Sequence, residues 1–270
     1  TEDDPSGTGG DRTLTELQLI DLAKGTLIQT TSLAFKGGLI GVSPAGKTAA
    51  TRLLQGHDRI DLWNVETGKH VAGFRPYHQE EYPENFTPNQ YNMSMNPQVI
   101  RRLEFIDDAH LLTVSTQGRL VCWTIPECRP LYVCDGVTAL GVSPTGRFWS
   151  AQVDGTLVVV EARSGQVTGE IALTDRLNSL AFDPAGGRLL AHLSEVGGDS
   201  VALVDLQNGS ITERFPIPLY ASEASWVEGD YILLNHTTLF DVKRGVVAWT
   251  YQLPKGMHAD ESVAGRHWYL

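Results

Sequence analysis

Residue types that could perform chemistry gather in one stretch of this sequence, residues 75–98. His78, Glu80, Glu81 and Glu84 are side chains that could bind a metal ion. Their order lacks the repeated ligand spacing of a metal-binding motif, and carboxylates beside proline are usually just solvated. The sequence therefore predicts no metal site here.

The other histidines are scattered along the chain: His57, His70, His110, His192, His236, His258 and His267. They form no His-x-x-x-His, Ser-His-Asp or Cys-His pattern that sequence alone supports. Gly197-Gly198-Asp199 is interpreted as a turn between strands rather than a phosphate loop, because no helix follows it. The sequence predicts no catalytic residues and no cofactor.

The same stretch is rich in large apolar residues among prolines and asparagines. Long loops without secondary structure of their own are usually functional or disordered, and aromatic residues and Met are enriched in the cores of interfaces. The candidate binding residues are Tyr77, His78, Tyr82, Phe86, Tyr91 and Met93. The alternative is that the segment folds over a neighbouring element and caps it.

The elements around this stretch follow a repeat. Six short apolar runs carry a polar residue in third place: 19–22, 62–65, 122–125, 159–162, 203–206 and 239–242. Five of them are followed by glycine, at Gly25, Gly68, Gly165, Gly209 and Gly245, and Cys128 takes that place in the third. Glycine closes a tight hairpin by entering the left-handed conformation without steric cost. Each run therefore predicts a strand, a turn and a returning strand.

A second turn recurs ahead of the apolar runs. Residues 43–46, 143–146 and 183–186 share a Pro-x-Gly ending, in which proline presets φ and glycine ends the turn. Residues 107–109 and 228–230 occupy the same place in the other two units. Each unit thus contains four short strands and repeats about every 40 residues, which is typical of a propeller blade.

At residues 43–46 and 58–69 the chain resembles the WD-repeat family, and the resemblance extends over roughly residues 17–270. The family's Trp-Asp pair is replaced by Trp63-Asn64 and Trp123-Thr124. The resemblance implies a β-propeller that binds other proteins.

We expect an all-β protein: a β-propeller of four-stranded antiparallel blades. Five whole blades begin near Gly38, Val99, Gly136, Leu177 and Ala221. Residues 17–30 and 258–270 would combine into a sixth, composite blade, which removes the exposed sheet edges. Seven blades are the alternative. Residues 1–16 form a flexible acidic segment, residues 17–270 the propeller, and residues 76–98 its insertion loop.

Composition limits the choice of partner. The 270 residues carry a net charge of −11, and no basic stripe suited to a nucleic acid is found. No apolar run reaches the length of a membrane span, and the first ten residues do not resemble a signal peptide. Cys122 and Cys134 could form a bridge across two strands, or all three cysteines, with Cys128, could be free thiols. The compartment and the oligomeric state remain open.

Two functions follow from these observations. The first is a non-catalytic protein-interaction or scaffold module of the WD-repeat type. The second is a propeller enzyme or small-ligand binder that uses the central channel, with a site built from the first strands of the blades. The residues there, at 38–39, 100–102, 137–138, 178–179 and 223–224, do not converge on one chemistry, so the first function is preferred.

Overall fold

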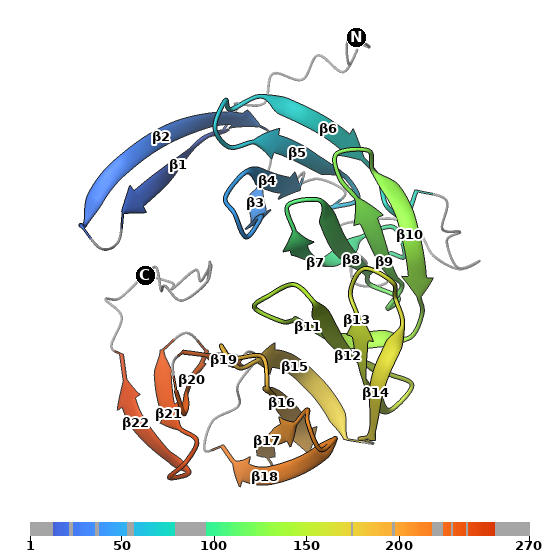
Figure 1. The fold of residues 1–270 in the computed structure, drawn as a ribbon, viewed down its shortest axis with the longest axis vertical. Coiled ribbons are helices and arrows are strands. Elements are labelled where there is room, and N and C mark those ends of the chain that lie inside the picture. The colour runs from blue at the N-terminus through green and yellow to red at the C-terminus, as the bar shows by residue number, and fades with distance from the viewer. Residues whose placement is uncertain are drawn as a thin grey trace.

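The protein, seen in a computed structural model, is built from β-strands joined by turns (Figure 1). The structure describes residues 13–21, 24–35, 38–52, 57–78, 96–173, 175–195, 198–217, 224–227, 229–235 and 237–251. No helix occurs among these residues, and this confirms the all-β prediction.

Five four-stranded antiparallel sheets follow one another along the chain, each with its strands in chain order. Blade 1 contains β3(Gly38–Val42), β4(Thr48–Arg52), β5(Ile60–Asn64) and β6(His70–Phe74). Blade 2 contains β7(Ile100–Asp107), β8(His110–Ser115), β9(Leu120–Thr124) and β10(Arg129–Cys134). Blade 3 contains β11(Val137–Val142), β12(Phe148–Val153), β13(Thr156–Glu161) and β14(Val167–Ala172). Blade 4 contains β15(Arg176–Phe182), β16(Arg188–Glu195), β17(Gly198–Asp205) and β18(Ser210–Pro216). Blade 5 contains β19(Ala224–Trp226), β20(Tyr231–Leu234), β21(Thr238–Asp241) and β22(Val246–Thr250).

A two-stranded sheet precedes blade 1. β1(Thr13–Asp21) pairs with β2(Thr26–Phe35) in an antiparallel hairpin. The first strand thus begins at Thr13, ahead of the boundary expected at residue 17. Leu17 packs against Ala49, as do Val42 and Trp63 of blade 1, and this contact attaches the hairpin to blade 1.

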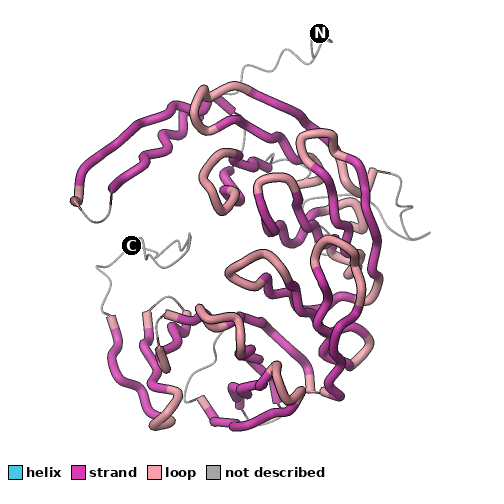
Figure 2. Tube along the Cα trace, in the orientation of Figure 1, coloured by secondary structure: helices cyan, strands magenta, loops and turns pink. Residues whose placement is uncertain are grey.

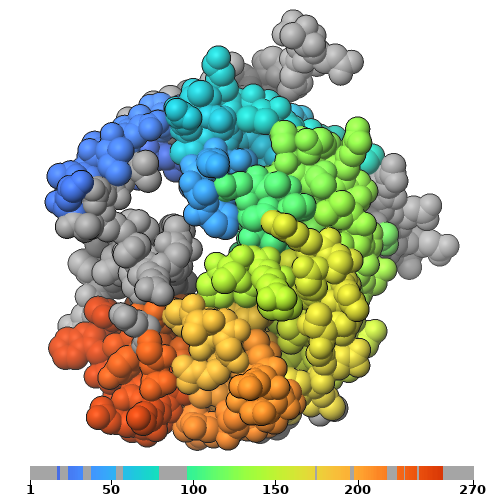
Figure 3. All heavy atoms as spheres, viewed as in Figure 1, coloured from blue at the N-terminus to red at the C-terminus, as the bar shows by residue number. Residues whose placement is uncertain are grey.

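The sheets are arranged around a common middle as the blades of a propeller, with β3, β7 and β11 innermost and β6, β10 and β14 on the rim (Figure 1). The trace shows the same ring from strand to strand (Figure 2), and adjoining blades touch from blade 1 to blade 5 (Figure 3). The propeller prediction is confirmed. The residues of the expected composite blade, 258–270, lie outside the described part of the chain, so six blades stay a prediction.

The apolar core lies between blades rather than within them. One cluster joins Leu62 of blade 1 to Leu111 of blade 2, and the next joins Leu120 to Trp149 of blade 3. Two further clusters join blade 3 to blade 4 and blade 4 to blade 5. Central strands are therefore apolar at successive positions, because both faces of each sheet are covered.

Ion pairs join neighbouring blades at the end of the ring where first strands turn into second strands and third strands into fourth. Lys47 of blade 1 lies 3.7 Å from Asp108 of blade 2, and Arg163 of blade 3 lies 3.1 Å from Asp107. Arg188 of blade 4 pairs with Asp230 of blade 5 at 3.2 Å. These pairs are partly exposed, so we assign them to alignment of the blades more than to stability.

Gly146 should be far more sensitive to substitution than its counterpart Gly186. Both end the same turn with positive φ, 67° and 75°. A Cβ at Gly146 would overlap the carbonyl oxygen of Ile106 in blade 2, whereas one at Gly186 meets nothing within 4 Å. Both alanine variants should lose about 1–3 kcal/mol through backbone strain, and Gly146→Ala a further 1–3 kcal/mol, roughly, through the overlap. Urea unfolding measures the difference, and equal losses would contradict close approach of blades 2 and 3.

Candidate interaction surface

The ring has two ends, and the insertion lies at one of them. In a four-stranded antiparallel sheet, the links after the second and fourth strands share one end. The insertion follows β6, a fourth strand, and the link from β4 to β5 lies beside it, where Ile100 N donates to the His57 carbonyl at 2.9 Å. We call this the insertion end.

Tyr77 anchors the start of the insertion in the core. Its side chain is 1% exposed and lies in the cluster between blades 1 and 2. The Tyr77 hydroxyl lies 2.8 Å from Thr113 Oγ1 and donates to the Arg119 carbonyl at 2.9 Å. Thr113 Oγ1 also accepts from Trp123 Nε1 at 2.9 Å.

The donor and acceptor in each of these hydrogen bonds can be assigned by counting protons. The Tyr77 hydroxyl has one proton and gives it to Arg119, so the Thr113 hydroxyl must donate to Tyr77. The sequence Trp123 to Thr113 to Tyr77 to Arg119 is thereby satisfied at every step. Buried hydrogen bonds linked in this way strengthen one another. Trp63 and Thr51 form the equivalent pair in blade 1, at 2.9 Å.

The insertion returns to blade 2 beside its point of departure. Gln98 Nε2 donates to the His78 carbonyl at 3.4 Å, and Gln98 N donates to Asn96 Oδ1 at 2.9 Å. The Thr116 hydroxyl donates to the Asn96 carbonyl at 2.5 Å. The described residues on either side of segment 79–95 therefore lie next to each other on the ring.

The structure describes two of the six predicted binding residues, Tyr77 and His78. Tyr77 is buried, in agreement with the capping alternative, and His78 is exposed with its Nδ1 2.9 Å from the Arg75 carbonyl. Tyr82, Phe86, Tyr91 and Met93 lie outside the described residues. Their binding role stays a prediction.

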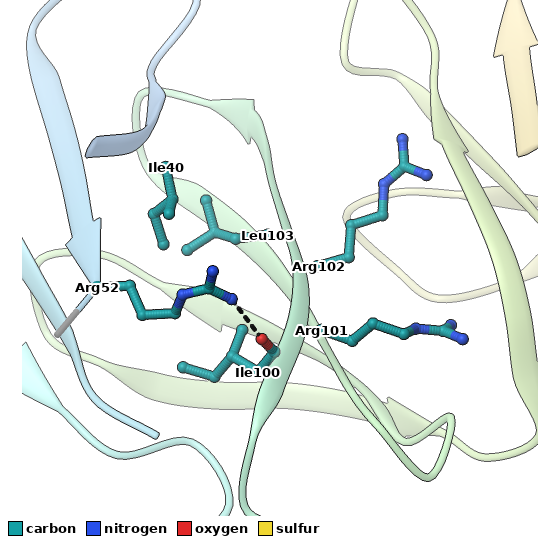
Figure 4. A pocket seen from close by; sticks show the side chains of 6 residues that line it. All are labelled: Ile40, Arg52, Ile100, Arg101, Arg102 and Leu103. Atoms are coloured by element: carbon teal, nitrogen blue, oxygen red, sulfur yellow. Dashed lines mark hydrogen bonds between the residues drawn. The ribbon is translucent and has the colours of Figure 1, made fainter. Parts of the chain in front are cut away.

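Three arginines contribute to the lining of a cavity of about 220 Å³ between blades 1 and 2. Arg101 and Arg102 belong to the first-strand positions considered in the sequence, whereas no sequence pattern indicates Arg52. Arg52 ends β4, and Arg101 and Arg102 follow the start of β7. Ile40, Ile100 and Leu103 complete the lining. Figure 4 shows Arg52 reaching toward β7 on the side of Ile40 and Leu103, whereas the side chains of Arg101 and Arg102 extend from the other side of that strand.

Each guanidinium makes one contact that fixes its place. Arg52 Nη1 donates to the Ile100 carbonyl at 2.7 Å, and Arg101 Nη2 donates to the Val137 carbonyl of blade 3 at 3.1 Å. Arg102 Nε donates to Glu104 Oε1 at 3.0 Å. Desolvation lowers the pKa of Arg52, and desolvation together with the charge of Arg102 lowers the pKa of Arg101. Both guanidinium groups remain charged at neutral pH, because an arginine side chain is effectively always protonated.

The first strands place different side chains at equivalent positions. β7, β11 and β15 each contain a bulge, at Arg101, Thr138 and Asn178, and all three side chains are exposed. A bulge leaves its residue unpaired and redirects its side chain. The Thr138 hydroxyl donates to Gln152 Oε1 at 3.1 Å. These positions offer a cation, a hydroxyl and an amide rather than one repeated chemistry.

Blade 4 brings together Ser179, His192 and Asp199, a combination that serves nucleophilic catalysis in hydrolases. His192 is fully buried, and its Nε2 lies 3.4 Å from Asp199 Oδ2. Neither ring nitrogen is aligned for a hydrogen bond, and Ser179 Oγ makes none. A nucleophilic serine needs a hydrogen bond to its base and access to substrate. We therefore treat this cluster as part of the core.

Cysteines and acidic groups add no site among the described residues. Cys122 lies opposite Tyr132, and Cys134 opposite Leu120, so the two are offset in register, and all three thiols are free. No group of three His, Cys, Asp or Glu side chains gathers as a metal site within the described part of the chain. No helix in that part could cross a membrane.

No protein-family model matches the chain, and no curated protein matches it. The resemblance to WD-repeat proteins thus depends on the pattern of strands and turns. Membership of that family is a proposal.

Removing the Tyr77 hydroxyl should destabilise the ring. Tyr77→Phe keeps the packing but leaves the Thr113 hydroxyl and the Arg119 carbonyl without this partner in a buried place. We expect a loss of about 1–3 kcal/mol in the free energy of unfolding, measured by urea denaturation. Tyr231→Phe, at a partly exposed tyrosine, is the control and should stay within about 0.5 kcal/mol of wild type. Equal effects would contradict the anchoring role.

His192 should make stability depend on pH. Burial lowers the pKa of His192 below its ordinary value, and the Asp199 carboxylate opposes this shift. An unfolded chain, whose histidine titrates near about pH 6.5, then binds more protons than the folded one. The free energy of unfolding should fall as the pH drops below that value, by at most about 1.4 kcal/mol per pH unit from this residue.

The control substitution for His192 comes from the neighbouring blade. Gln152 of blade 3 pairs with Ala139 as His192 pairs with Ser179, so the two positions are equivalent. His192→Gln should reduce the loss of stability between pH 7.5 and pH 5.5, measured by urea denaturation at each pH. An unchanged loss in this variant would show that other groups cause the pH dependence.

Proposed function

We propose that this chain is a non-catalytic protein-interaction module of the WD-repeat type, which presents its insertion to a partner protein. The observation that supports this most is the anchoring of the insertion. Tyr77 and Asn96 fix its two ends on blade 2 through buried or short hydrogen bonds. The blade repeat itself requires no such segment.

A fixed attachment favours binding for an energetic reason. Association costs the freedom of the groups that become ordered, so a loop held at both ends loses less on binding than a free one. The residues between the anchors include Tyr82, Phe86 and Tyr91. Tyrosine is among the residues that most often dominate binding energy at interfaces, in contact with apolar neighbours such as Phe.

A second candidate function is favoured by the cavity between blades 1 and 2. There Arg52 donates to the Ile100 carbonyl beside the aliphatic side chains of Ile40 and Leu103, and such a concave place suits a small ligand better than it suits a flat protein surface. This would make the ring a ligand-binding propeller. The experiment below separates the two, because only the first requires the insertion.

The test compares the intact ring with a ring whose residues 79–95 are replaced by a short Gly-Ser linker. The His78 and Gln98 anchors adjoin, so the linker can join them without strain. A partner captured by the intact ring from the source organism is identified, purified and titrated against both proteins by calorimetry. The intact ring should bind it, and the linker variant should bind at least about 30-fold more weakly.

Point variants refine this test. Tyr82→Ala and Phe86→Ala should each weaken binding by about 2 kcal/mol if these residues are hot spots, with the melting temperature unchanged. Tyr77→Phe is the opposite control, since it should lower stability and leave affinity nearly unchanged. A partner that binds the linker variant as tightly as the intact ring would refute the role of the insertion.

A further inference from the structure

The fourth strand of a blade turns one face toward the next blade. In blade 1, Phe74 lies beside Trp123 of blade 2, with ring centroids 4.9 Å apart. Ile171 of blade 3 packs against the apolar cluster shared with blade 4. In blade 4, Phe215 lies beside Phe240 of blade 5, with ring centroids 6.5 Å apart. This face is therefore an interface between blades.

The register of the strands identifies the same face in blade 5. Each of these fourth strands has a bulge against its third strand, and Tyr132 in β10 and Trp249 in β22 are the first paired residues beyond it. Two residues beyond the matching position lie Phe215 in β18 and Tyr251 directly after β22. Because alternate residues of a strand share a face, Trp249 and Tyr251 point to where a next blade would lie.

In blade 5 this face is exposed. Trp249 is 62% exposed and Tyr251 is 43% exposed, whereas Tyr132 and Phe215 are half-buried against the blade that follows. Large apolar groups that lie together on a surface usually mark a place of contact. The end of blade 5 is thus a docking surface, and the question is which element covers it.

The β1–β2 hairpin is built like the outer half of a blade. Its pairing shifts between Leu19 and Ile20, as the pairing of the third and fourth strands of blade 3 shifts between Val159 and Val160. Gly25 closes its turn at φ 63°, close to the 71° of Gly165. The hairpin therefore corresponds to a third and a fourth strand. Within the described ranges, its sheet has no first or second strand.

The turn between third and fourth strands receives an aromatic ring from the preceding blade. A Cβ at Gly165 would lie 2.8 Å from the ring of Tyr132. The Tyr132 hydroxyl also donates to the Ala162 carbonyl beside this turn at 2.6 Å. A Cβ at Gly245 would lie 3.2 Å from the ring of Phe215. Glycine in this turn thus makes room for the ring as well as allowing positive φ.

Gly209 shows the turn without such a ring. A Cβ at Gly209 meets nothing within 4 Å, and blade 3 has Gly169 in the place that Tyr132 holds in blade 2. A Cβ at Gly25 also meets nothing within 4 Å, although blade 5 has Trp249 in that place. The hairpin turn and the end of blade 5 are therefore complementary surfaces.

We propose that the face of β22 with Trp249 and Tyr251 docks the sixth blade of the same chain, with the Trp249 ring against Gly25. Its third and fourth strands are β1 and β2, and its first and second strands are residues 258–270. This joint gives blade 5 a second neighbour and closes the ring.

The place of the hairpin favours the same chain over a second copy. Leu17 attaches the hairpin to blade 1, so the hairpin and β22 are the two ends of one described ring (Figure 1). Residues 258–270 follow β22 in the sequence after a short link. The joint concerns blade 5 and the hairpin alone, so it does not depend on the proposed function.

The test compares two glycines with the same backbone conformation. Gly25 and Gly209 have φ of 63° and 62°, so alanine strains the backbone alike at both. We expect Gly25→Ala to lower the melting temperature by at least about 2 °C more than Gly209→Ala, because only the first Cβ would meet an aromatic ring. Circular dichroism measures both, and equal shifts would overturn the docking.

A double-mutant cycle assigns the ring that makes the contact. In a Trp249→Ala background, the additional loss at Gly25 should vanish, since the Cβ then has room. Tyr132 and Gly165 are the positive control, because their contact is seen directly. An additional loss at Gly25 that persists without the Trp249 ring would overturn the assignment of Trp249.

Trp249 also reports which occupant covers it. The protein is labelled with 5-fluorotryptophan, its Trp249 signal is assigned with Trp249→Phe, and the shift of that signal between H2O and D2O measures exposure. We expect a small shift in the intact chain, present as a monomer by light scattering, and a full shift in a chain that ends at Met257.

The other outcomes point to other occupants. A full shift in the intact monomer overturns docking by the same chain and leaves the face to a partner protein, and burial that grows with protein concentration overturns it in favour of a second copy. Burial that survives removal of residues 258–270 overturns their assignment. If the shortened chain does not fold, the two glycines still decide the docking in the intact chain. None of these measurements uses a partner, so failure here leaves the linker variant to decide the proposed function by itself.

Discussion

The constraint on which this structure depends is that each blade has two apolar faces. A sheet covered on one side only would leave leucine, isoleucine and valine side chains in water, and the core clusters are all shared between successive sheets. Each blade is therefore stable only between two neighbours, and a ring is the arrangement that gives every blade two. The described ring ends at β22 on one side and at the β1–β2 hairpin on the other (Figure 1). All five residues of β22 are exposed, with Trp249 at 62%.

Apolar side chains pack in a similar way between all neighbouring blades. The blades therefore differ from one another mainly in the polar contacts that they make. The last part of the second strand is the best example. Arg52 reaches the Ile100 carbonyl at the start of the next blade. Gln152, in the equivalent place, donates to the Leu173 and Asp175 carbonyls and accepts from Leu177 N. His192 occupies the same position in blade 4 beside Asp199. The same position near the end of the second strand thus holds an arginine, a glutamine and a buried histidine in three different blades.

Local turn chemistry explains why the fold could be predicted. Glycine at Gly68 and Gly165 needs positive φ, and both have it, at 66° and 71°. Cys128, which replaces glycine in the third unit, takes the same left-handed conformation at φ 54°. Each turn and each apolar run is contained in a stretch of about ten residues, so the sequence alone predicts it. The blades therefore begin close to the positions that the sequence predicts.

The site could not be predicted in the same way, because its contacts join residues far apart in the chain. In the sequence Tyr77 stands among the other candidate binding residues, and its burial and its contact with Thr113 distinguish it as a core residue. Arg52 and Arg101 belong to different blades, and each looks like an ordinary charged strand end. Ser179, His192 and Asp199 could have been found by aligning the blades in register. Their burial, which argues against catalysis, could not have been found by such an alignment.

Electrostatic effects in this acidic ring are local. The Debye length at physiological ionic strength is about 8 Å, so exposed charges that lie farther apart along the ring act weakly on one another. At the end of the ring opposite the insertion, Asp107, Asp108 and Asp230 are engaged by cations of neighbouring blades. Net charge is a property of the whole ring, whereas the individual contacts between blades are set by the few residues that depart from the repeat.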